Sequence, residues 1–132
     1  MDNLEDVGVL LVDDDEEIRH ALRLLFEFDD FAVVGEASNG LDAIALAVRH
    51  QPAFVLLDFE MPGMAGDKVA EVIRSVSPIT RIVAFSAYLA AKPEWADAFL
   101  NKDRIAQVAP LLERLVARRL RTSRVPVTAA RS

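Results

Sequence analysis

Short apolar runs alternate with amphipathic segments along this chain. The runs are rich in Val, Ile, Leu and Phe, which is typical of strands buried on both faces. We expect strands over Val7–Val12, Phe31–Ala37, Ala53–Leu57, Arg81–Phe85 and Ala98–Asn101. Strands that alternate with helices favour βαβ units. The pattern therefore predicts an α/β fold with a five-stranded, doubly wound parallel sheet and helices on both faces.

Between these runs, apolar residues recur at helical spacing, and each stripe is expected to face the sheet. The four stripes are Ile18, Leu22, Leu25 and Phe26; Leu41, Ile44, Ala45 and Val48; Val69, Val72, Ile73 and Val76; and Leu111, Leu112, Leu115 and Val116. Asp15 and either Ser38 or Asn39 are the expected caps of the first two helices. The last helix should begin near Pro110, where proline costs nothing, and end near Leu120.

Composition narrows the classes of protein. The 132 residues are 52% apolar and 27% charged and include no cysteine. Disulfides, thiolate metal sites and a cysteine nucleophile are therefore excluded. No apolar run approaches the ~18 residues of a membrane span, and the acidic start lacks the pattern of a signal peptide. We expect a cytoplasmic protein that does not contact membranes.

The net charge of −6 is unevenly distributed, with −12 over residues 1–103 and +6 over residues 104–132. An acidic body repels phosphates, so we expect no direct contact with nucleic acid. The Arg-rich end fits the solvated face of a final helix, or a contact with an acidic partner. We expect one domain over residues 1–121, followed by a flexible tail or the start of a linker over 122–132.

Polar side chains follow the predicted strands where ligands bind in such sheets, beyond the carboxyl ends. They are Asp13, Asp14, Asp58, Ser86 and Lys102. Taken singly, each has an ordinary explanation, since an Asp can cap a helix, a Ser can lie in a turn and a Lys can be a surface charge. Their occurrence on separate loops at one edge favours a shared site.

Three carboxylates in one pocket repel one another, because two charges 4 Å apart interact at ~4 kcal/mol with an effective dielectric of 20. Lys102 offsets one of them. Oxygen-only ligands in a wet pocket suit Mg²⁺. Such a cation beside a lysine, a hydroxyl and a spare carboxylate indicates a site for a phosphoryl group.

Four segments together resemble the receiver domain of bacterial two-component response regulators over about residues 7–120. They are Val9–Asp15, Val55–Met64, Ser86–Ala87 and Phe99–Lys102. The Lys-Asp pair at 102–103 is closer to the NarL/LuxR-type branch of that family. The resemblance implies a flavodoxin-like sheet with strand order 2-1-3-4-5.

The resemblance also implies roles for the acidic residues. Asp58 would be the phosphoacceptor, which takes a phosphoryl group from a sensor histidine kinase or a phosphotransfer protein. Asp14 and Asp58, with the backbone carbonyl of Glu60, would bind Mg²⁺ directly, and Asp13 would hold it through water.

Lys102 and Ser86 would contact the phosphoryl oxygens, and Ser86 and Phe99 would be switch residues. Phe99 can equally be a static core residue. The switching surface would serve a partner or a homodimer. The output remains open between a stand-alone regulator and the receiver half of a DNA-binding protein.

One segment departs from the family. Ser86 and Lys102 are only 16 positions apart, roughly six fewer than usual and close to two helical turns. We therefore expect the fourth helix to be shortened or missing, with a mobile loop over 87–97. Trp95 would either fill the vacated space or belong to a partner face, and the partner surface would shift toward Leu111–Leu120.

Two other functions compete with the receiver. Haloacid dehalogenase-like phosphatases also place an Asp after a buried strand with an acid two positions on, as in Asp58-Phe59-Glu60. They need a longer chain and an acidic pair after the nucleophile, whereas Asp13-Asp14 precedes it. The second alternative is a receiver-like interaction domain that works without phosphorylation.

Overall fold

A single parallel sheet organises the chain, with strand order β2-β1-β3-β4-β5. The computed structural model describes residues 7–88 and 90–117. In chain order the elements are β1 (Gly8–Val12), α1 (Glu16–Phe28), β2 (Ala32–Ala37), α2 (Gly40–His50), β3 (Phe54–Leu57), α3 (Gly66–Val76), β4 (Arg81–Ser86) and β5 (Ala98–Asn101). The predicted fold class and strand order are confirmed.

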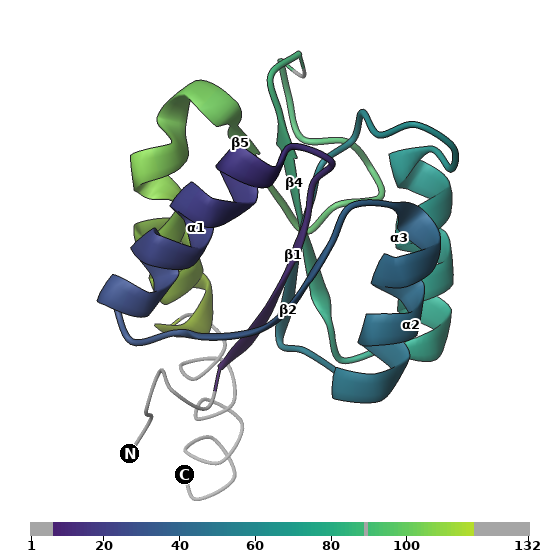
Figure 1. Ribbon diagram of the computed structural model, residues 1–132, viewed down its shortest axis with the longest axis horizontal. Coiled ribbons are helices and arrows are strands. Elements are labelled where there is room, and N and C mark those ends of the chain that lie inside the picture. Colours follow the sequence, from purple (N-terminus) through teal and green to yellow (C-terminus); the bar gives the residue numbers. More distant parts are fainter. Residues whose placement is uncertain (1–6, 89, 118–132) are drawn as a thin grey trace, which may run out of the picture.

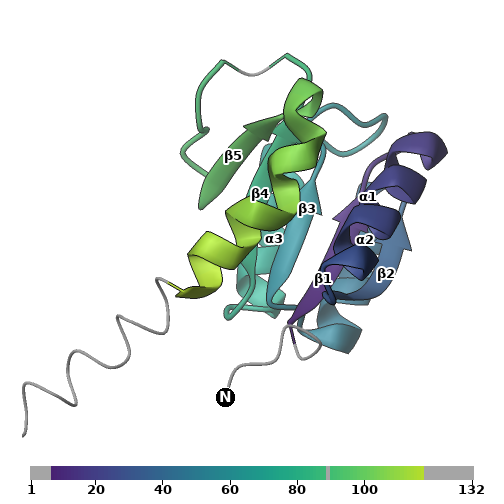
Figure 2. The same cartoon turned by 90° about the vertical axis from the view of Figure 1, so that its left-hand side faces the viewer.

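After β5 the chain forms a short 3-10 helix, η2 (Lys102–Gln107), and then the final helix, described over residues 108–117. This helix and α1 cover one face of the sheet, while α2 and α3 cover the other (Figure 1). Figure 2 shows α1 and the final helix side by side in front of the sheet. The predicted helix end near Leu120 and the boundary between 121 and 122 lie outside the described residues.

Two apolar layers hold the helices on the sheet. Leu22 and Phe26 of α1 and Leu112 of the final helix are fully buried against one face, and Phe26 meets Phe31 edge-on at 5.5 Å between ring centroids. Ile73 of α3 is buried against the other face. Each such side chain contributes about 1.5–3 kcal/mol by leaving water, so the predicted stripes of these three helices account for their positions.

The predicted helix caps are confirmed for the first two helices. Asp15 accepts hydrogen bonds from the backbone N–H groups of Glu17 at 2.9 Å and Ile18 at 3.3 Å. Asn39, rather than Ser38, caps α2 by accepting from the N–H of Asp42 at 2.9 Å. Each cap satisfies a backbone donor that the helix itself leaves unpaired.

The predicted inward stripe of α2 is wrong. Leu41 is 70% exposed, Val48 is 52% exposed and Ala45 also faces solvent, while Ile44 is half-buried. The buried positions are small: Gly40, Ala43 and Ala47. The reason is close helix packing, because a Cβ on Gly40 would lie only 2.7 Å from Val69 Cγ2 of α3.

No helix joins β4 to β5 in the described part of the connection, so the predicted loss of the fourth helix is confirmed. Trp95 packs instead on the α2–α3 side of the core and stacks on Phe59, with ring centroids 5.7 Å apart and planes at 10°. Arg74 Nη2 donates to Trp95 O at 2.7 Å, and Asp97 Oδ2 accepts from Ile82 N at 2.7 Å. Trp95 therefore fills part of the vacated space.

The acidic edge of the sheet follows from strand register. Val12 pairs with Leu57 and Leu57 with Ala84, so the strands end side by side. The N–H of Asp58 continues the ladder by donating to Val12 O at 2.9 Å. No helix within the described ranges is long and apolar enough to cross a membrane.

Candidate functional site

Three carboxylates meet at the carboxyl ends of β1 and β3. Asp13 and Asp58 follow these strands directly and are only 1% and 3% exposed, whereas Asp14 is exposed. One carboxylate oxygen from each residue lies within 4.8 Å of the others. The expected acidic cluster is therefore present as one group.

Backbone donors hold one oxygen of each buried carboxylate. Asp13 Oδ1 accepts from the N–H of Asp15 at 2.9 Å, and Asp58 Oδ1 accepts from the N–H of Glu60 at 3.1 Å. These local bonds are the turns that Asp favours because its short side chain reaches the backbone two residues on. They direct the two Oδ2 atoms toward the same space.

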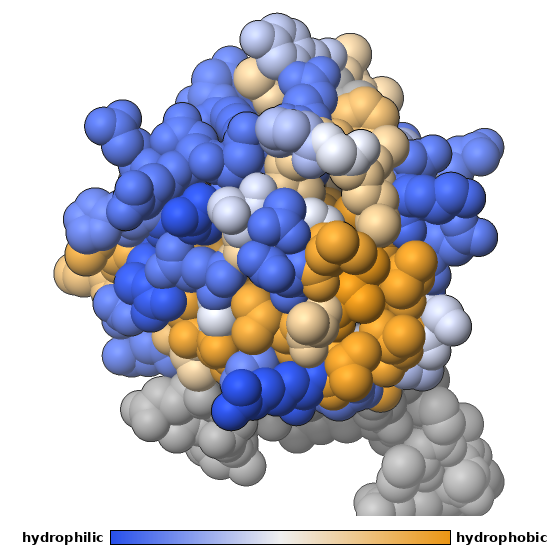
Figure 3. Space-filling view, turned by 45° about the vertical axis from the view of Figure 1, so that its right-hand side comes forward, coloured by the Kyte–Doolittle hydropathy of each residue, from blue (hydrophilic) through white to orange (hydrophobic). Residues whose placement is uncertain are grey.

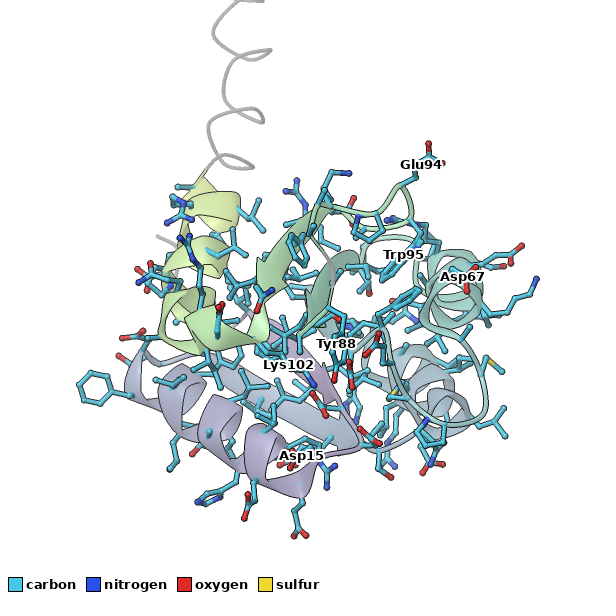
Figure 4. All side chains as sticks on the ribbon, turned by 90° about the horizontal axis from the view of Figure 1, so that it is seen from above. Asp15, Asp67, Tyr88, Glu94, Trp95 and Lys102 are labelled. Atoms are coloured by element: carbon cyan, nitrogen blue, oxygen red, sulfur yellow. The ribbon has the colours of Figure 1, made fainter. Side chains whose placement is uncertain are left out.

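Lys102 supplies the positive charge of the site. It begins η2, next to the end of β5, and its Nζ lies 2.7 Å from Asp13 Oδ2 and 3.3 Å from Asp58 Oδ2. Figure 4 shows it at the centre of this edge, between Asp15 at the start of α1 and Trp95 on the β4–β5 connection. One ammonium thus pairs with two buried carboxylates, and the third carboxylate of the cluster, Asp14, adds a further negative charge.

This imbalance changes the acidity of the groups. Burial raises the pKa of Asp58 to about 6, with a further contribution from the charge of Asp13, although the Glu60 N–H and Lys102 oppose the rise. Burial acts to lower the pKa of Lys102, but its contacts with Asp13 and Asp58 outweigh that effect and the pKa is raised. Lys102 is therefore firmly protonated.

The donor set fits a hard divalent cation. Asp13 Oδ2 is buried and meets Lys102 as an ion pair, yet it accepts no hydrogen bond of good geometry from any residue that the structure describes. The side-chain ligands in reach, Asp13, Asp14 and Asp58, offer only oxygen atoms and carry more charge than Lys102 neutralises. Few carboxylates in an open site with room for water are typical of Mg²⁺ binding.

The other predicted side chains, Ser86 and Phe99, lie on the neighbouring strands β4 and β5. Ser86 is buried at the end of β4, and its Oγ accepts a hydrogen bond from Tyr88 N at 3.2 Å. Phe99 lies on β5 opposite Ala84 and is partly exposed. The structure thus brings Asp13, Asp14, Asp58 and Lys102 together and leaves Ser86 bonded within its own loop.

Three charged residues beside the site, Arg19, Arg23 and Glu36, form a brace that was not predicted from the sequence. Arg19 Nη1 donates to the backbone oxygen of Asp13 at 2.6 Å, while its Nε pairs with Glu36 Oε1 at 3.0 Å. Arg23 Nε contacts the other oxygen of Glu36 at 2.6 Å. Burial acts to raise the pKa of Glu36, but the two guanidinium groups outweigh it and the pKa is lowered. The available signal was Glu36 itself, an acid within an apolar strand.

Comparisons with known proteins agree with this geometry. Residues 9–103 match the family described as "Response regulator receiver domain". The nitrate/nitrite response regulator protein NarL of Escherichia coli K12 is 39% identical over 110 residues, which cover 78% of this chain and 51% of that protein. The chain thus spans about half the length of the curated relatives it matches.

Solved structures show the same fold. The receiver domain of the NarL regulator from Mycobacterium tuberculosis has a TM-score of 0.69 and 31% identity, covering 82% of this chain and 96% of that one. A CheX–CheY complex with BeF₃ and Mg²⁺ from Borrelia burgdorferi has a TM-score of 0.69 and 27% identity, covering 83% and 87%.

Proposed function

This chain belongs to the response-regulator receiver family, and from that membership we propose that it takes up a phosphoryl group on Asp58. The donor would be a phosphohistidine of a sensor histidine kinase or a phosphotransfer protein. The observation that carries the proposal is the position of Asp58, buried at the end of β3 with its Oδ2 facing Lys102.

Asp58 is better placed for transfer than its acidic neighbours. Asp13 Oδ2 already lies 2.7 Å from Lys102, so its charge is neutralised more completely than that of Asp58 at 3.3 Å. Asp14 is exposed and lacks the low-dielectric surroundings in which positioned charges act most strongly. Asp58 combines burial with a longer, less complete pairing to Lys102, which leaves its Oδ2 more available than that of Asp13.

The transfer itself needs little covalent help from the protein. A carboxylate oxygen of Asp58 forms a bond to phosphorus, and the bond from phosphorus to the donor imidazole nitrogen breaks. The electron pair leaves with that nitrogen, so the histidine is regenerated. Because the transition state is loose, positioning and charge neutralisation matter more than nucleophilic strength. Asp58 must be ionised, because protonation makes the carboxyl oxygens much weaker nucleophiles.

Asp14 and Asp58 would hold Mg²⁺ directly together with the backbone carbonyl of Glu60, and Asp13 would hold it through water. When bound, the cation offsets the negative charge of the phosphoryl oxygens. Asp13 keeps Lys102 in the pocket through the 2.7 Å ion pair. Lys102 can then turn toward a phosphoryl oxygen without leaving the site.

Ser86 would couple the product to the β4–β5 connection. Its Oγ accepts a hydrogen bond from Tyr88 N at 3.2 Å while its own proton stays free to donate, so a shift of the hydroxyl toward a phosphoryl oxygen would be passed to Tyr88. That change alters the start of the loop that replaces the fourth helix. Phe99 on the adjacent strand β5 would respond as the switch residue.

The protein would act as a signalling acceptor and not as a turnover enzyme, because each phosphoryl group stays on Asp58 until hydrolysis. A chain without cysteine suits the reducing cytoplasm, where we place the reaction. The phosphatase alternative loses its support, because the acidic pair precedes Asp58 and the family match is to receivers.

Intact-mass spectrometry tests the proposal. The full chain is incubated with acetyl phosphate and Mg²⁺, and we expect the mass of one phosphoryl group to be added. Asp58→Asn should gain none, whereas Asp67→Asn, a matched change of an exposed acid on α3, should behave as the parent. Phosphorylation of the Asp58→Asn protein would refute the assignment. A parent chain that stays unmodified would favour the phosphorylation-independent interaction domain.

A further inference from the structure

The outer face of α2 carries an apolar stripe that is largely exposed in the described structure. Leu41, Ala45 and Val48 are exposed, and Ile44 is half-buried along one border. Figure 3 shows apolar side chains gathered into a patch on the side of the molecule that carries α2. Contiguous apolar surface of this kind commonly marks a contact with another protein.

Rotation of α2 cannot bury this stripe. The inward face is made of Gly40, Ala43 and Ala47, and Gly40 admits α3 so closely that any side chain there would collide with Val69. Turning larger residues inward would force the two helices apart. The stripe is therefore a lasting feature of the surface.

Two opposite charges flank the stripe on one side. Asp42 and Arg49 are both exposed and lie seven residues apart, which places them on the same flank of the helix, about 10 Å apart along its axis. They are too distant to pair with each other, and Arg49 forms no ion pair with any residue in the described ranges. The acid lies in the first turn and the base in the last turn of α2.

We propose that α2 is a self-association surface on which a second copy of this chain packs its own α2 in the antiparallel direction. A two-fold axis perpendicular to the helices, passing near Ala45, lays the stripe of each copy on the stripe of the other. The same operation keeps the charged flanks together and reverses the ends, so Asp42 of each copy faces Arg49 of the second copy.

The charges also select this orientation. In a parallel pair related by a two-fold axis along the helices, the charged flanks would lie on opposite sides of the contact and would not meet. Ala45 at the centre lets the helix axes approach to the usual 8–10 Å of packed helices. Apolar contact and two ion pairs thus agree on one arrangement, which does not depend on the proposed phosphoryl transfer.

The contact should be weak. An eleven-residue helix is about 16 Å long, so two such faces bury less than the roughly 1,200 Å² of a standard stable interface. We expect the dimer to form only at high protein concentration. The final helix is a poorer candidate for this surface than the sequence suggested, because Leu112 and Leu115 are buried in the core.

Sedimentation equilibrium of the full chain, without phosphodonor, tests the proposal between about 10 µM and 1 mM, the range expected for a contact this small. The average mass should rise from 14.6 kDa toward twice that value. Leu41→Glu and Val48→Glu should each reduce association at least about tenfold, because they place charge in the apolar contact. Leu24→Glu on α1 is the matched control at a 55% exposed leucine, and it should leave association unchanged.

Charge exchange tests the orientation. Asp42→Arg and Arg49→Asp should each weaken association by placing like charges together. Their double variant should restore it, and so should an equimolar mixture of the two single variants, because each copy then offers what the other lacks. Circular dichroism checks that every variant is folded.

Three results would overturn the proposal. The first is a chain that stays monomeric at the highest concentration. The second is loss of association in Leu24→Glu equal to that in Leu41→Glu, which would place the contact elsewhere. The third is failure of both the double variant and the mixture to recover association that the single exchanges had weakened.

Discussion

Replacing Asp58 by Asn should stabilise the metal-free protein at neutral pH. The carboxylate of Asp58 is buried, and its pKa is raised from an ordinary value of 3.8 to about 6 by burial and by the charge of Asp13. An asparagine of nearly the same shape removes the charge. Its Oδ1 can still accept the hydrogen bond that Glu60 N donates at 3.1 Å.

The magnitude follows from the pKa of Asp58. Each pKa unit corresponds to about 1.4 kcal/mol, so keeping Asp58 ionised when the solution is neutral lowers the free energy of unfolding by about 3 kcal/mol. The variant loses the attraction of Lys102 at 3.3 Å and places an amide beside that ammonium. We therefore expect a net gain of about 1–3 kcal/mol.

The gain should depend on pH in a defined direction. Because the folded-state pKa is raised from 3.8 to about 6, the folded protein holds the proton of Asp58 more tightly than the unfolded chain does, and the parent chain loses stability as the pH rises from about 4 to about 6. The amide of the Asp58→Asn variant does not titrate in this range. The difference between the two proteins should accordingly be small below about pH 4, grow between about pH 4 and 6, and reach its full size above about pH 7.

Urea denaturation with EDTA, measured from about pH 3.5 to 8, gives the comparison. Asp67→Asn, at an exposed position, controls for the loss of one negative charge and should change stability little at any pH. Added Mg²⁺ should then reverse the order, since the parent chain keeps its ligand and gains binding free energy. The reasoning would be refuted if Asp58→Asn were less stable than the parent at neutral pH with EDTA. It would also be refuted if the difference in the free energy of unfolding did not shrink toward the acid end of the range.

Three further changes test other contacts. Arg19→Ala should weaken Mg²⁺ binding about tenfold in calorimetry, because it frees the backbone of Asp13. Arg19→Lys should lose less Mg²⁺ affinity. Unchanged affinity in Arg19→Ala would show that the brace does not position the site. Asp97→Ala removes the acceptor for the backbone N–H of Ile82 and for Arg74, so it should lower the free energy of unfolding by about 1–3 kcal/mol in urea denaturation. A loss under half of that would mean that other contacts hold the β4–β5 connection. Lys102→Met should tighten Mg²⁺ binding, because the ammonium that competes with the cation is gone. The same change should slow phosphorylation by acetyl phosphate about tenfold or more. A variant in which Mg²⁺ affinity and phosphorylation rate both rise, or both fall, would contradict the assigned role of Lys102.

Much of the fold could be predicted from local pattern. A strand buried on both faces must be apolar throughout, so β1, β3 and β4 were visible as runs, and their ends differed from prediction by one residue. Phe31 shows why ends are less certain, since it is fully part of the core although the β2 ladder begins at Ala32. Burial and ladder hydrogen bonding need not stop at the same residue.

The acidic cluster was also within reach of the sequence. In a parallel sheet every strand ends at the same edge, so Asp13, Asp58 and Lys102 had to approach one another once the strand order was right. The brace from Arg19 to Glu36 was not within reach. It joins α1 to β2 across 17 positions, and a charged residue on a helix gives no sign of which distant acid it meets.

The α2 helix shows most clearly what the sequence determined and what only the tertiary structure decided. Periodicity by itself predicted a helix with an apolar stripe over residues 40–50, and spacing predicted a shortened or missing fourth helix, which is absent from the described part of the β4–β5 connection. Only tertiary structure decided which side of α2 faces the core. The reason is physical: hydrophobicity favours burying Leu41 and Val48, but the close approach of α3 at Gly40 admits only small side chains, and packing distance depends on both helices at once.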